Sequence, residues 1–409
     1  MAKKNSKKTV PDLRFRGFTD PWEQRQLGEV AEIVGGGTPD SSNADYWDGD
    51  IDWYTPSEIG ESRSVQTSAK KITREGLDHS SARLLPAGSI LFTSRASIGL
   101  MAFISRPSAT NQGFQSLVPS NNVDSNFLYA LGPYISRYAK KHAAGSTFIE
   151  ISGSSLAKAP LRIPSLAEQC RIGTFFSKLD SLIAAAERQE ALLRQKKQAY
   201  LQLMFPCEGE TQPRLRFSGF IQNWRMHRMS EMVAPLNSIQ QIMPDRDIEY
   251  RLWSVPSFQL GVPENVRGSR IMSSKLVLER DDILLSKINP RIQRIWRVDS
   301  DGTLPDVGST EWVVFRAKPS KASPLFLKAL LSSPLFYRYM VSTEKGATGS
   351  QKRADKTLLM SSCYWLPSLS EQQRIGAFFH LVDATLLTVQ RNLAGLKELK
   401  RAYLQRMFI

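Results

Sequence analysis

Residues 163–205 read IPSLAEQCRIGTFFSKLDSLIAAAERQEALLRQKKQAYLQLMF, and residues 366–408 read LPSLSEQQRIGAFFHLVDATLLTVQRNLAGLKELKRAYLQRMF. Roughly half of the paired positions are identical at an offset of 203 residues, so the two stretches are copies of one repeat. A second pair supports the first: PDLRFRGFTDPW at Pro11–Trp22 recurs as PRLRFSGFIQNW at Pro213–Trp224. The stretches that separate these copies differ in sequence. The repeat therefore predicts two equivalent halves that share a framework and carry different domains.

Each copy of the longer repeat has the pattern of one long amphipathic helix. Apolar or large residues recur at steps of four and three along 168–205 and along 371–408, which is typical of a heptad seam. Ser165 before Glu168, and Ser368 before Glu371, match the capping box that begins a helix. We predict two long helices that bury their seams against each other as a coiled coil.

The stretches before the two helices have the pattern of mixed α/β domains. Four short apolar runs predict strands, at Ser89–Thr93, Leu117–Pro119, Asp282–Leu285 and Trp312–Phe315, and helical pieces follow at Asn126–Lys141 and Ser323–Met340. The fold class predicted is therefore α+β. The boundaries predicted are a basic arm at 1–20, domains at 21–160 and 223–364, helical regions at 161–206 and 365–409, and a connector at 207–222.

Charge and cysteine content narrow the function classes. Lysine and arginine outnumber aspartate and glutamate by 54 to 39, giving a net charge of +15, which predicts attraction to a polyanion, with nucleic acid first and an anionic membrane second. A basic protein without such a partner is the alternative. No apolar run is long enough to span a bilayer, so we expect no membrane partner. Three widely spaced cysteines predict a reducing, cytoplasmic compartment, and the four histidines show no metal-ligand spacing with them.

Motifs for catalysis are weak or absent. The sequence holds no G-x-x-x-x-G-K-[ST] phosphate loop and no Gly-rich cofactor loop with an Asn-Pro-Pro-aromatic tetrapeptide, which disfavours an ATPase and a methyltransferase. Gly35-Gly36-Gly37-Thr38-Pro39 is interpreted as a flexible turn. A nuclease reading could use Pro244-Asp245 and Glu249, but Arg251 stands where such a site needs lysine. We therefore expect no catalytic residue, no metal and no cofactor in this chain.

Basic, amide and hydroxyl residues in the loops of the two domains are the candidate DNA-binding residues. Arginine or lysine reads guanine, and asparagine or glutamine reads adenine, through paired donors and acceptors in the major groove, while other cations contact phosphates. A solvated surface role is the alternative for each of them. The candidates are Lys70, Lys71, Arg95, Ser97, Asn111 and Gln112 in the first domain, and Lys287, Asn289, Arg291, Gln293, Arg294, Gln351, Lys352 and Arg353 in the second.

The paired [IL]-P-S-L-x-E-Q-x-R-I-G-x-F-F segments, the AYLQ-x-MF endings and the segment at 13–40 resemble the specificity subunit of type I restriction–modification systems. The resemblance covers essentially the whole chain. It implies two target recognition domains that each read one half of a bipartite, asymmetric site in double-stranded DNA. It also implies antiparallel helices that set the unread spacer, and an internal pseudo-twofold symmetry.

The same resemblance implies partners. The helices would dock two modification subunits, which carry S-adenosylmethionine and methylate adenine, and restriction subunits would add ATP- and Mg-dependent translocation and cleavage. Six aromatic residues of the repeat are expected to contact those partners: Phe175, Phe176, Phe378, Phe379, Tyr200 and Tyr403. Two other classes stay open, a single-chain nuclease or methyltransferase and a coiled-coil adaptor with non-specific DNA affinity.

Overall fold

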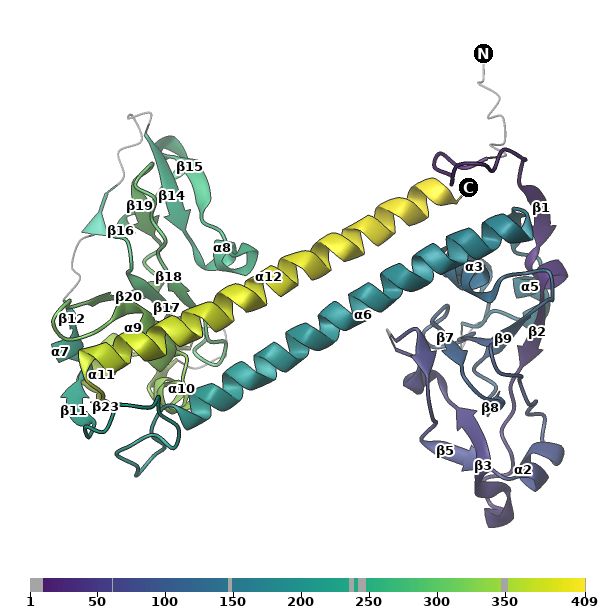
Figure 1. Ribbon diagram of the computed structural model, residues 1–409, viewed down its shortest axis with the longest axis horizontal. Helices are drawn as coiled ribbons and strands as arrows, with labels where there is room; N and C mark the ends of the chain where they lie inside the picture. The colour runs from purple at the N-terminus through teal and green to yellow at the C-terminus, as the bar shows by residue number, and fades with distance from the viewer. Residues whose placement is uncertain are drawn as a thin grey trace. The chain divides into compact units, whose positions relative to one another are not determined.

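A computed structural model describes residues 10–60, 62–145, 149–234, 239–241, 248–346 and 352–408. The chain divides into two compact units. Unit 1 is Met1–Arg188 with Gln390–Ile409, and unit 2 is Gln189–Val389. The two long helices, α6 (Leu166–Leu203) and α12 (Leu369–Met407), each contribute a segment to both units (Figure 1). Each helix begins two residues before the start that the periodicity predicts.

The described residues of unit 1 form three sheets. Their strand orders are β2-β9-β6-β7-β4, β5-β3-β8 and β1-β10. The central strand β6 carries the continuous apolar run that the sequence marks as buried, and all three of its residues are inaccessible to solvent. The strands are β1 (Glu23–Gln26), β2 (Ala31–Gly35), β3 (Trp47–Tyr54), β4 (Ser64–Val65), β5 (Lys70–Ile72), β6 (Ile90–Phe92), β7 (Met101–Ile104), β8 (Ser108–Thr110), β9 (Gln115–Pro119) and β10 (Pro160–Ile163).

Five shorter α-helices belong to the described part of unit 1. The predicted helical piece Asn126–Lys141 is two helices, α3 (Ser125–Ala130) and α4 (Gly132–His142), because Pro133 lacks the amide hydrogen that a continuous helix needs and is accepted in the first turn of a new one. The short helices are α1 (Leu27–Val30), α2 (Arg74–Asp78) and α5 (Gly153–Ala157). The main core cluster of unit 1 joins Trp22, Phe92 and Phe127 to Phe176 of α6.

Unit 2 has a four-stranded sheet of order β12-β20-β17-β18, a five-stranded sheet of order β13-β16-β19-β14-β15, and the pairs β11-β23 and β21-β22. The strands are β11 (Arg225–Arg228), β12 (Val233–Ala234), β13 (Ile239–Gln240), β14 (Glu249–Trp253), β15 (Glu264–Arg267), β16 (Lys275–Val277), β17 (Ile283–Ser286), β18 (Ile295–Arg297), β19 (Asp306–Gly308), β20 (Trp312–Ala317), β21 (Glu344–Lys345), β22 (Arg353–Ala354) and β23 (Cys363–Leu366). The buried strand β17 occupies the place that β6 has in unit 1, between two antiparallel neighbours.

A second break interrupts the helical piece predicted at Ser323–Met340. It forms α9 (Pro324–Leu331) and α10 (Pro334–Ser342), where each helix begins at a proline. The other helices of unit 2 are α7 (Met229–Met232), α8 (Val255–Leu260) and α11 (Lys356–Ser361). The main core cluster includes Trp224, Phe326, Phe336 and Phe379, so unit 2, like unit 1, encloses an aromatic side chain of a long helix.

Inside unit 1, the start of α6 packs on the end of α12. The Phe175 and Tyr403 rings lie 4.9 Å apart, and Lys400 Nζ is 2.7 Å from Asp180 Oδ1. Because higher residue numbers in α6 pair with lower ones in α12, the two segments run in opposite directions in this unit.

Unit 2 contains the same contacts at the positions offset by 203. The Tyr200 and Phe378 rings lie 5.1 Å apart, and Lys197 Nζ is 2.7 Å from Asp383 Oδ1. The carboxylate also binds a domain residue in each unit, Arg63 for Asp180 and Lys328 for Asp383. The contact between the helix segments is thus common to the units, and the cation supplied by the domain differs.

The repeated glutamates do not complete the capping boxes that the sequence predicts. Within the described chain, Glu168 accepts hydrogen bonds from Arg14 at 2.8 and 2.6 Å and from Trp22 Nε1 at 3.2 Å, rather than from the helix N-cap. Glu371 likewise accepts from Arg216. Both carboxylates are almost inaccessible, and the hydrogen bond to Glu168 raises the pKa of Arg14. This motif therefore fastens the segment before each domain to the start of a long helix.

The repeated glycine explains how closely each long helix approaches its domain. A Cβ at Gly173 would lie 2.7 Å from the Phe127 amide nitrogen of α3, and one at Gly376 would lie 2.6 Å from that of Phe326 in α9. Real side chains do not tolerate such contacts, so glycine is required where a helix backbone meets another closely.

No helix of the described residues is long and apolar enough to cross a membrane.

Candidate nucleic-acid interface

The loop after β6, Thr93–Gly99, has a left-handed backbone at a residue other than glycine. Ala96 has φ +60°, a conformation that costs on the order of 1–3 kcal/mol and persists only where surrounding contacts impose it. Those contacts are present: Gly99 donates its amide hydrogen to Thr93 O at 2.9 Å, and Ile151 donates to Ser94 O at 3.0 Å. A Cβ at Gly99 would also collide with Ser136 of α4. The loop is rigidly held against α4 and against the strand-like segment at Ile151.

In unit 2 the loop after β17 also has a left-handed backbone at a residue other than glycine. Asn289 has φ +47°, its amide donates to Lys352 O at 2.9 Å, and Ala354 donates to Lys287 O at 2.8 Å. The bond from Ile151 to Ser94 and the bond from Ala354 to Lys287 join equivalent segments of the two units. Two loops of different sequence therefore have a left-handed residue at the same distance from one common anchor.

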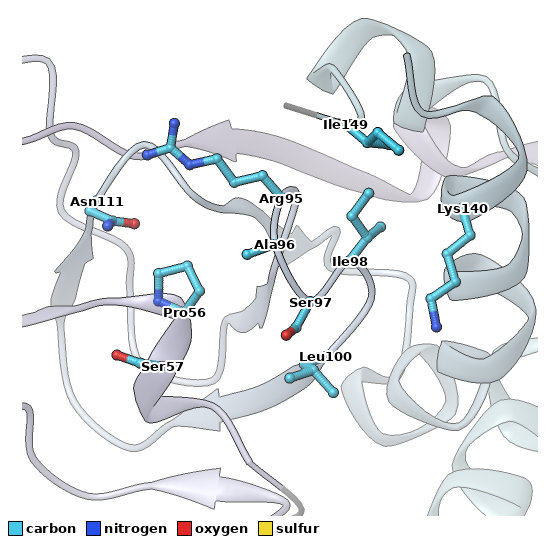
Figure 2. A pocket seen from close by; sticks show the side chains of 10 residues that line it. All are labelled: Pro56, Ser57, Arg95, Ala96, Ser97, Ile98, Leu100, Asn111, Lys140 and Ile149. Atoms are coloured by element: carbon cyan, nitrogen blue, oxygen red, sulfur yellow. The ribbon is translucent and has the colours of Figure 1, made fainter. Parts of the chain in front are cut away.

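The constrained loop of unit 1 lines a surface pocket of about 1030 Å³. Figure 2 shows the Arg95 side chain extending toward the Asn111 side of this pocket, and the Lys140 side chain on the opposite side, on α4. Pro56, Ile98 and other apolar groups form part of the wall. The full lining is Pro56, Ser57, Arg95, Ala96, Ser97, Ile98, Leu100, Asn111, Lys140 and Ile149.

The polar groups of this pocket are mainly donors. Among the described residues, neither the Arg95 guanidinium nor the Lys140 ammonium has a hydrogen-bond acceptor or a carboxylate partner. Asn111 Oδ1 accepts from the Gly113 amide at 2.9 Å, which leaves its amide hydrogens available. Unpaired cations beside amide and hydroxyl donors suit a ligand that is anionic and rich in acceptors, as DNA is.

The structure brings together three of the six candidates of the first domain, Arg95, Ser97 and Asn111. Gln112 is exposed nearby in sequence and accepts a hydrogen bond from Thr38. Sequence reasoning missed Ser57 and Lys140. The run Lys140-Lys141-His142 at the end of a helix is a signal that could have found Lys140, since basic residues gathered in one turn are a mark of anion contacts.

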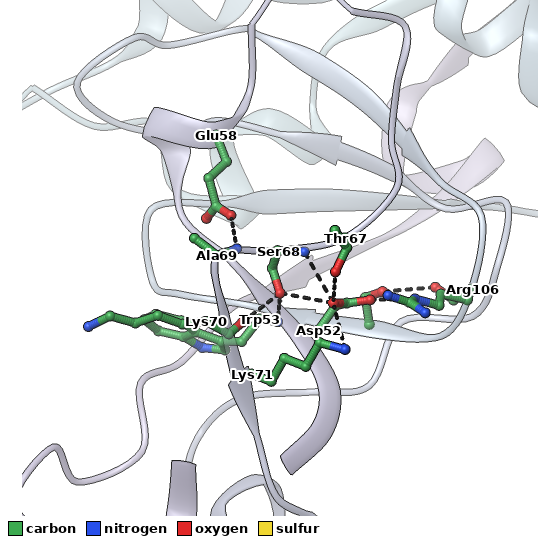
Figure 3. Close-up of polar contacts among 10 residues, drawn as sticks. Asp52, Trp53, Glu58, Thr67, Ser68, Ala69, Lys70, Lys71 and Arg106 are labelled. Atoms are coloured by element: carbon green, nitrogen blue, oxygen red, sulfur yellow. Dashed lines mark hydrogen bonds and ion pairs between the residues drawn. The ribbon is translucent and has the colours of Figure 1, made fainter. Parts of the chain in front are cut away.

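Lys70 and Lys71 lie on β5, away from this pocket. Lys70 Nζ is 5.5 Å from the Trp47 ring centre, and Lys71 Nζ is 3.8 Å from Asp52 Oδ1. Figure 3 shows Asp52 at the centre of a polar cluster that includes Thr67, Ser68 and Arg106. Lys71 therefore has an internal partner, and the two lysines do not join Arg95 in one site.

Asp52 makes the stability of unit 1 dependent on pH. Burial alone would raise the pKa of this carboxyl, but hydrogen bonds from the Ser68 amide, Arg106 and Thr67 outweigh it and lower the pKa below the ordinary value of 3.8. A carboxyl with a lowered folded-state pKa stabilises the fold above its unfolded pKa and loses that contribution as pH falls through the folded value. We expect unit 1 to lose stability below about pH 4, measured by hydrogen exchange at β3.

The matched variant for this prediction is Asp52→Asn, which removes the titrating charge while keeping the side-chain shape. It should be less stable than the parent at pH 7, and its stability should depend less on pH between 5 and about 2.5. An Asp52→Asn protein with an unchanged acid transition would show that another carboxyl is responsible.

In unit 2 the candidates gather around the constrained loop and β22. Three of the cations have carboxylate partners: Glu344 binds Arg291 at 3.2 Å and Lys352 at 2.8 Å, and Glu311 binds Arg353 at 3.1 Å. Gln293 donates to Leu331 O at 2.7 Å. Lys287, Asn289 and Arg294 are the remaining candidates at this loop, and Gln351 lies outside the described residues.

The two glutamates of this cluster are not predicted from the sequence, because isolated acidic residues carry no local signal. Hydrogen bonding by Lys352, followed by that of Arg291, lowers the pKa of Glu344 below 4.5. A phosphate approaching Arg291 or Lys352 would compete with this carboxylate. The surface of unit 2 is therefore less open to an anion than the pocket of unit 1.

The six aromatic residues expected to contact partners fall into two groups. Phe176 and Phe379 are 1% and 3% exposed and belong to the cores of their units, so they offer no surface to a partner in this structure. Phe176 and Phe379 are each the second residue of a Phe-Phe pair, and the sequence prediction treated each pair as one apolar surface open to a partner. Neighbouring residues on a helix point about 100° apart, so the two rings of a pair face different surroundings. Phe175, Phe378, Tyr200 and Tyr403 are half-buried.

The residues named for the nuclease alternative do not form a metal-binding site in the described part of the chain. Pro244 and Asp245 lie outside the described residues. Arg251 is ion-paired with Asp299 at 3.1 Å and Asp301 at 3.2 Å. Among the residues that the structure describes, no group of three or more His, Cys, Asp or Glu side chains could hold a metal ion.

Comparison with known proteins finds similarity over a segment of the chain. Residues 19–195 match the family model described as type I restriction modification DNA specificity domain. The chain is 37% identical over 176 residues to the type I restriction enzyme MjaIX specificity subunit of Methanocaldococcus jannaschii, covering 42% of this chain and 41% of that protein. It is 33% identical over 190 residues to the EcoR124I/EcoR124II specificity subunit of Escherichia coli, covering 44% and 46%. The matched segments thus span less than half of each relative.

The fold has a solved counterpart over nearly the whole chain. The crystal structure of a type I restriction–modification S subunit from M. genitalium superimposes with a TM-score of 0.65 at 13% identity, covering 98% of this chain and 99% of that one. At this identity the likeness concerns the fold alone. The family model, the curated relatives and this structure are all specificity subunits or domains of type I restriction–modification systems, and the chain is similar to them over these segments and in its fold.

Proposed function

We propose that this chain is the DNA-recognition subunit of a type I restriction–modification complex and performs no chemistry itself. The observation that carries the proposal is the unit 1 pocket, where Arg95 and Lys140 have no internal acceptor within the described chain. The net charge of +15 supports the same function, because counterion release from DNA favours a basic surface. Unit 1 reads one half of a bipartite target and unit 2 the other.

The constrained loops support reading by both units. The loop at Ala96 in unit 1 and the loop at Asn289 in unit 2 share a left-handed residue and one hydrogen-bonded anchor, while the side chains that they carry differ. A fixed backbone with variable side chains lets two units present different donors in the same manner. The two half-sites therefore differ in sequence, and the target is asymmetric.

The long helices set the unread spacer between the half-sites. In this proposal α6 and α12 form an antiparallel coiled coil with an internal pseudo-twofold symmetry. The contacts that recur at an offset of 203 support it: Phe175 with Tyr403 and Tyr200 with Phe378, together with the two Asp–Lys pairs. Helices are stiff at this length, so they hold recognition domains at a defined separation.

The same helices dock two modification subunits, which bind S-adenosylmethionine and methylate adenine. Half-buried Phe175, Phe378, Tyr200 and Tyr403 are the candidate contacts, and leucines such as Leu182 and Leu381, 56% and 66% exposed, add apolar surface. Restriction subunits, using ATP and Mg²⁺, complete the complex that cleaves unmodified DNA.

Methylation mapping with a domain exchange tests the proposal. The chain and its modification subunits are expressed in a methylation-free host, and the methylated motif is read by single-molecule sequencing. Replacing residues 21–160 with the corresponding domain of a relative should change one half of the motif and leave the other half and the spacer intact, because each unit has its own core.

A motif that changes in both halves would contradict the modular reading.

A second measurement separates recognition from adaptor function. The wild-type complex should bind its own site at least about 10³-fold more tightly than unrelated duplex, and its affinity should fall steeply with salt. Equal affinity for all duplexes would favour the adaptor.

A further inference from the structure

We propose that Arg95 determines specificity by reading a guanine in the half-site of unit 1, with Lys140 contacting the sugar–phosphate backbone beside it. This inference rests on the proposed function and assigns a base and two separate roles within the same pocket. It follows from three observations on the loop, the guanidinium and the neighbouring amide.

The first observation is the rigidity of the backbone that carries Arg95. Ala96, the next residue, keeps a strained left-handed conformation, and the loop is closed by the Gly99 to Thr93 hydrogen bond and packed on Ser136. Arg95 itself forms a backbone bridge with Glu150. Strain of this kind is concentrated where a side chain must be presented in one position. Rigid support is what base discrimination requires, since a mispaired donor must not be able to relax.

The second observation is that the Arg95 guanidinium is available. Three other arginines of unit 1 have carboxylate partners: Arg14 binds Glu168, Arg63 binds Asp180 and Arg106 binds Asp52. Arg95 lines the pocket with no acceptor among the described residues. A free, planar fork of donors matches the O6 and N7 acceptors of guanine, and no other base presents two acceptors in this arrangement in the major groove.

The third observation separates Arg95 from its neighbours. Asn111 would need both a donor and an acceptor to read adenine, and one of the two lone pairs of its Oδ1 is taken by the Gly113 amide, so it is less open to that pairing than the Arg95 fork is to guanine. Lys140 stands across the pocket on the last turn of α4, with Lys141 and His142 beside it (Figure 2). A flexible ammonium next to further basic residues is suited to phosphate, which carries no sequence information.

The test compares Arg95 and Lys140 variants of the full chain in complex with its modification subunits. Methylation mapping of the wild-type complex gives the motif, and the exchange of residues 21–160 identifies the half read by unit 1. Arg95→Ala should lose discrimination at one guanine of that half, by roughly 10- to 100-fold, while every other position is kept. Arg95→Lys retains the charge and can still donate to guanine, so it should keep more of the discrimination than Arg95→Ala, which guards against a loss of folding as the explanation.

Lys140→Ala is the matched control. It should weaken binding to all duplexes, lower the salt dependence by about one ion and leave the motif unchanged. If Lys140→Ala broadened the motif, or Arg95→Ala left it intact, the assignment of roles would be overturned.

A modified base sharpens the test. Replacing the identified guanine by 7-deazaguanine removes the N7 acceptor, so it should weaken binding by wild type and have little further effect on Arg95→Ala. Equal penalties for both proteins would refute the contact. A wild-type complex that yields no motif would defeat the proposed function itself, whereas a motif without an Arg95-dependent guanine in the unit 1 half would overturn this inference alone.

Discussion

Replacing Phe176 with alanine is expected to lower the free energy of unfolding of unit 1 by about 3–5 kcal/mol. The ring is 1% exposed and belongs to the core cluster that contains Trp22 and Phe127, and the ring of partly buried Phe408, which packs against this cluster, lies 5.7 Å away. Alanine would remove the ring from a closely packed core, and the cavity left behind adds to the lost transfer free energy. Hydrogen exchange of the β6 amides in the full chain measures this stability.

The control is Leu182→Ala on the same helix, where the side chain is 56% exposed. It should cost less than about 0.5 kcal/mol, since surface substitutions of this kind rarely do more. The two variants separate folding from the proposed docking: if the long helices dock a modification subunit, Leu182→Ala should weaken co-purification with it without changing hydrogen exchange. Unchanged β6 protection in Phe176→Ala would mean that the ring is not part of the unit 1 core.

Replacing Arg14 with alanine should destabilise unit 1 by a similar amount, about 3–5 kcal/mol. Glu168 is 1% exposed, and Arg14 binds both of its carboxylate oxygens. Without the guanidinium, only Trp22 Nε1 remains as a hydrogen-bond donor to a buried charge. An uncompensated buried carboxylate is costly, because the charge has lost its hydration without gaining a partner. Denaturant unfolding followed by hydrogen exchange at α3 and β10 measures the effect.

Two further variants make this prediction specific to burial. Arg25→Ala breaks an ion pair with Glu23 whose side chains are 52% and 69% exposed, so it should change stability by less than about 1 kcal/mol. Arg14→Ala combined with Glu168→Gln should recover part of the loss, since the buried charge is removed with its partner. If the double variant were as unstable as Arg14→Ala, packing of the Arg14 stem would explain the result.

The repeated framework was readable from the sequence because its signals are local. Helical periodicity and the apolar runs at β6 and β17 each reflect the spacing of apolar residues within a few positions of one another. The strands at Ile90–Phe92 and Trp312–Ala317 were found for the same reason. The breaks before Pro133 and Pro334 were missed where helical propensity on both sides hid the boundary.

The roles of individual side chains were less predictable, because they depend on partners far away in the chain. Glu168 matches a capping motif but binds Arg14, which lies more than a hundred residues earlier. Phe175 and Phe176 are neighbours in sequence, yet one is half-buried and the other lies in the core. Lys71, a candidate for DNA, is engaged by Asp52.

By itself the amino-acid sequence determined that the chain has two related halves, two long helices and a basic surface, since repeats, periodicity and net charge are properties of order and composition. Only the tertiary structure decided which cations stay free. Arg95 and Lys140 meet in one pocket across 45 residues, whereas Arg291 and Lys352 are joined by Glu344. An ion pair depends on distances of a few ångströms between distant residues, and the folded backbone sets those distances.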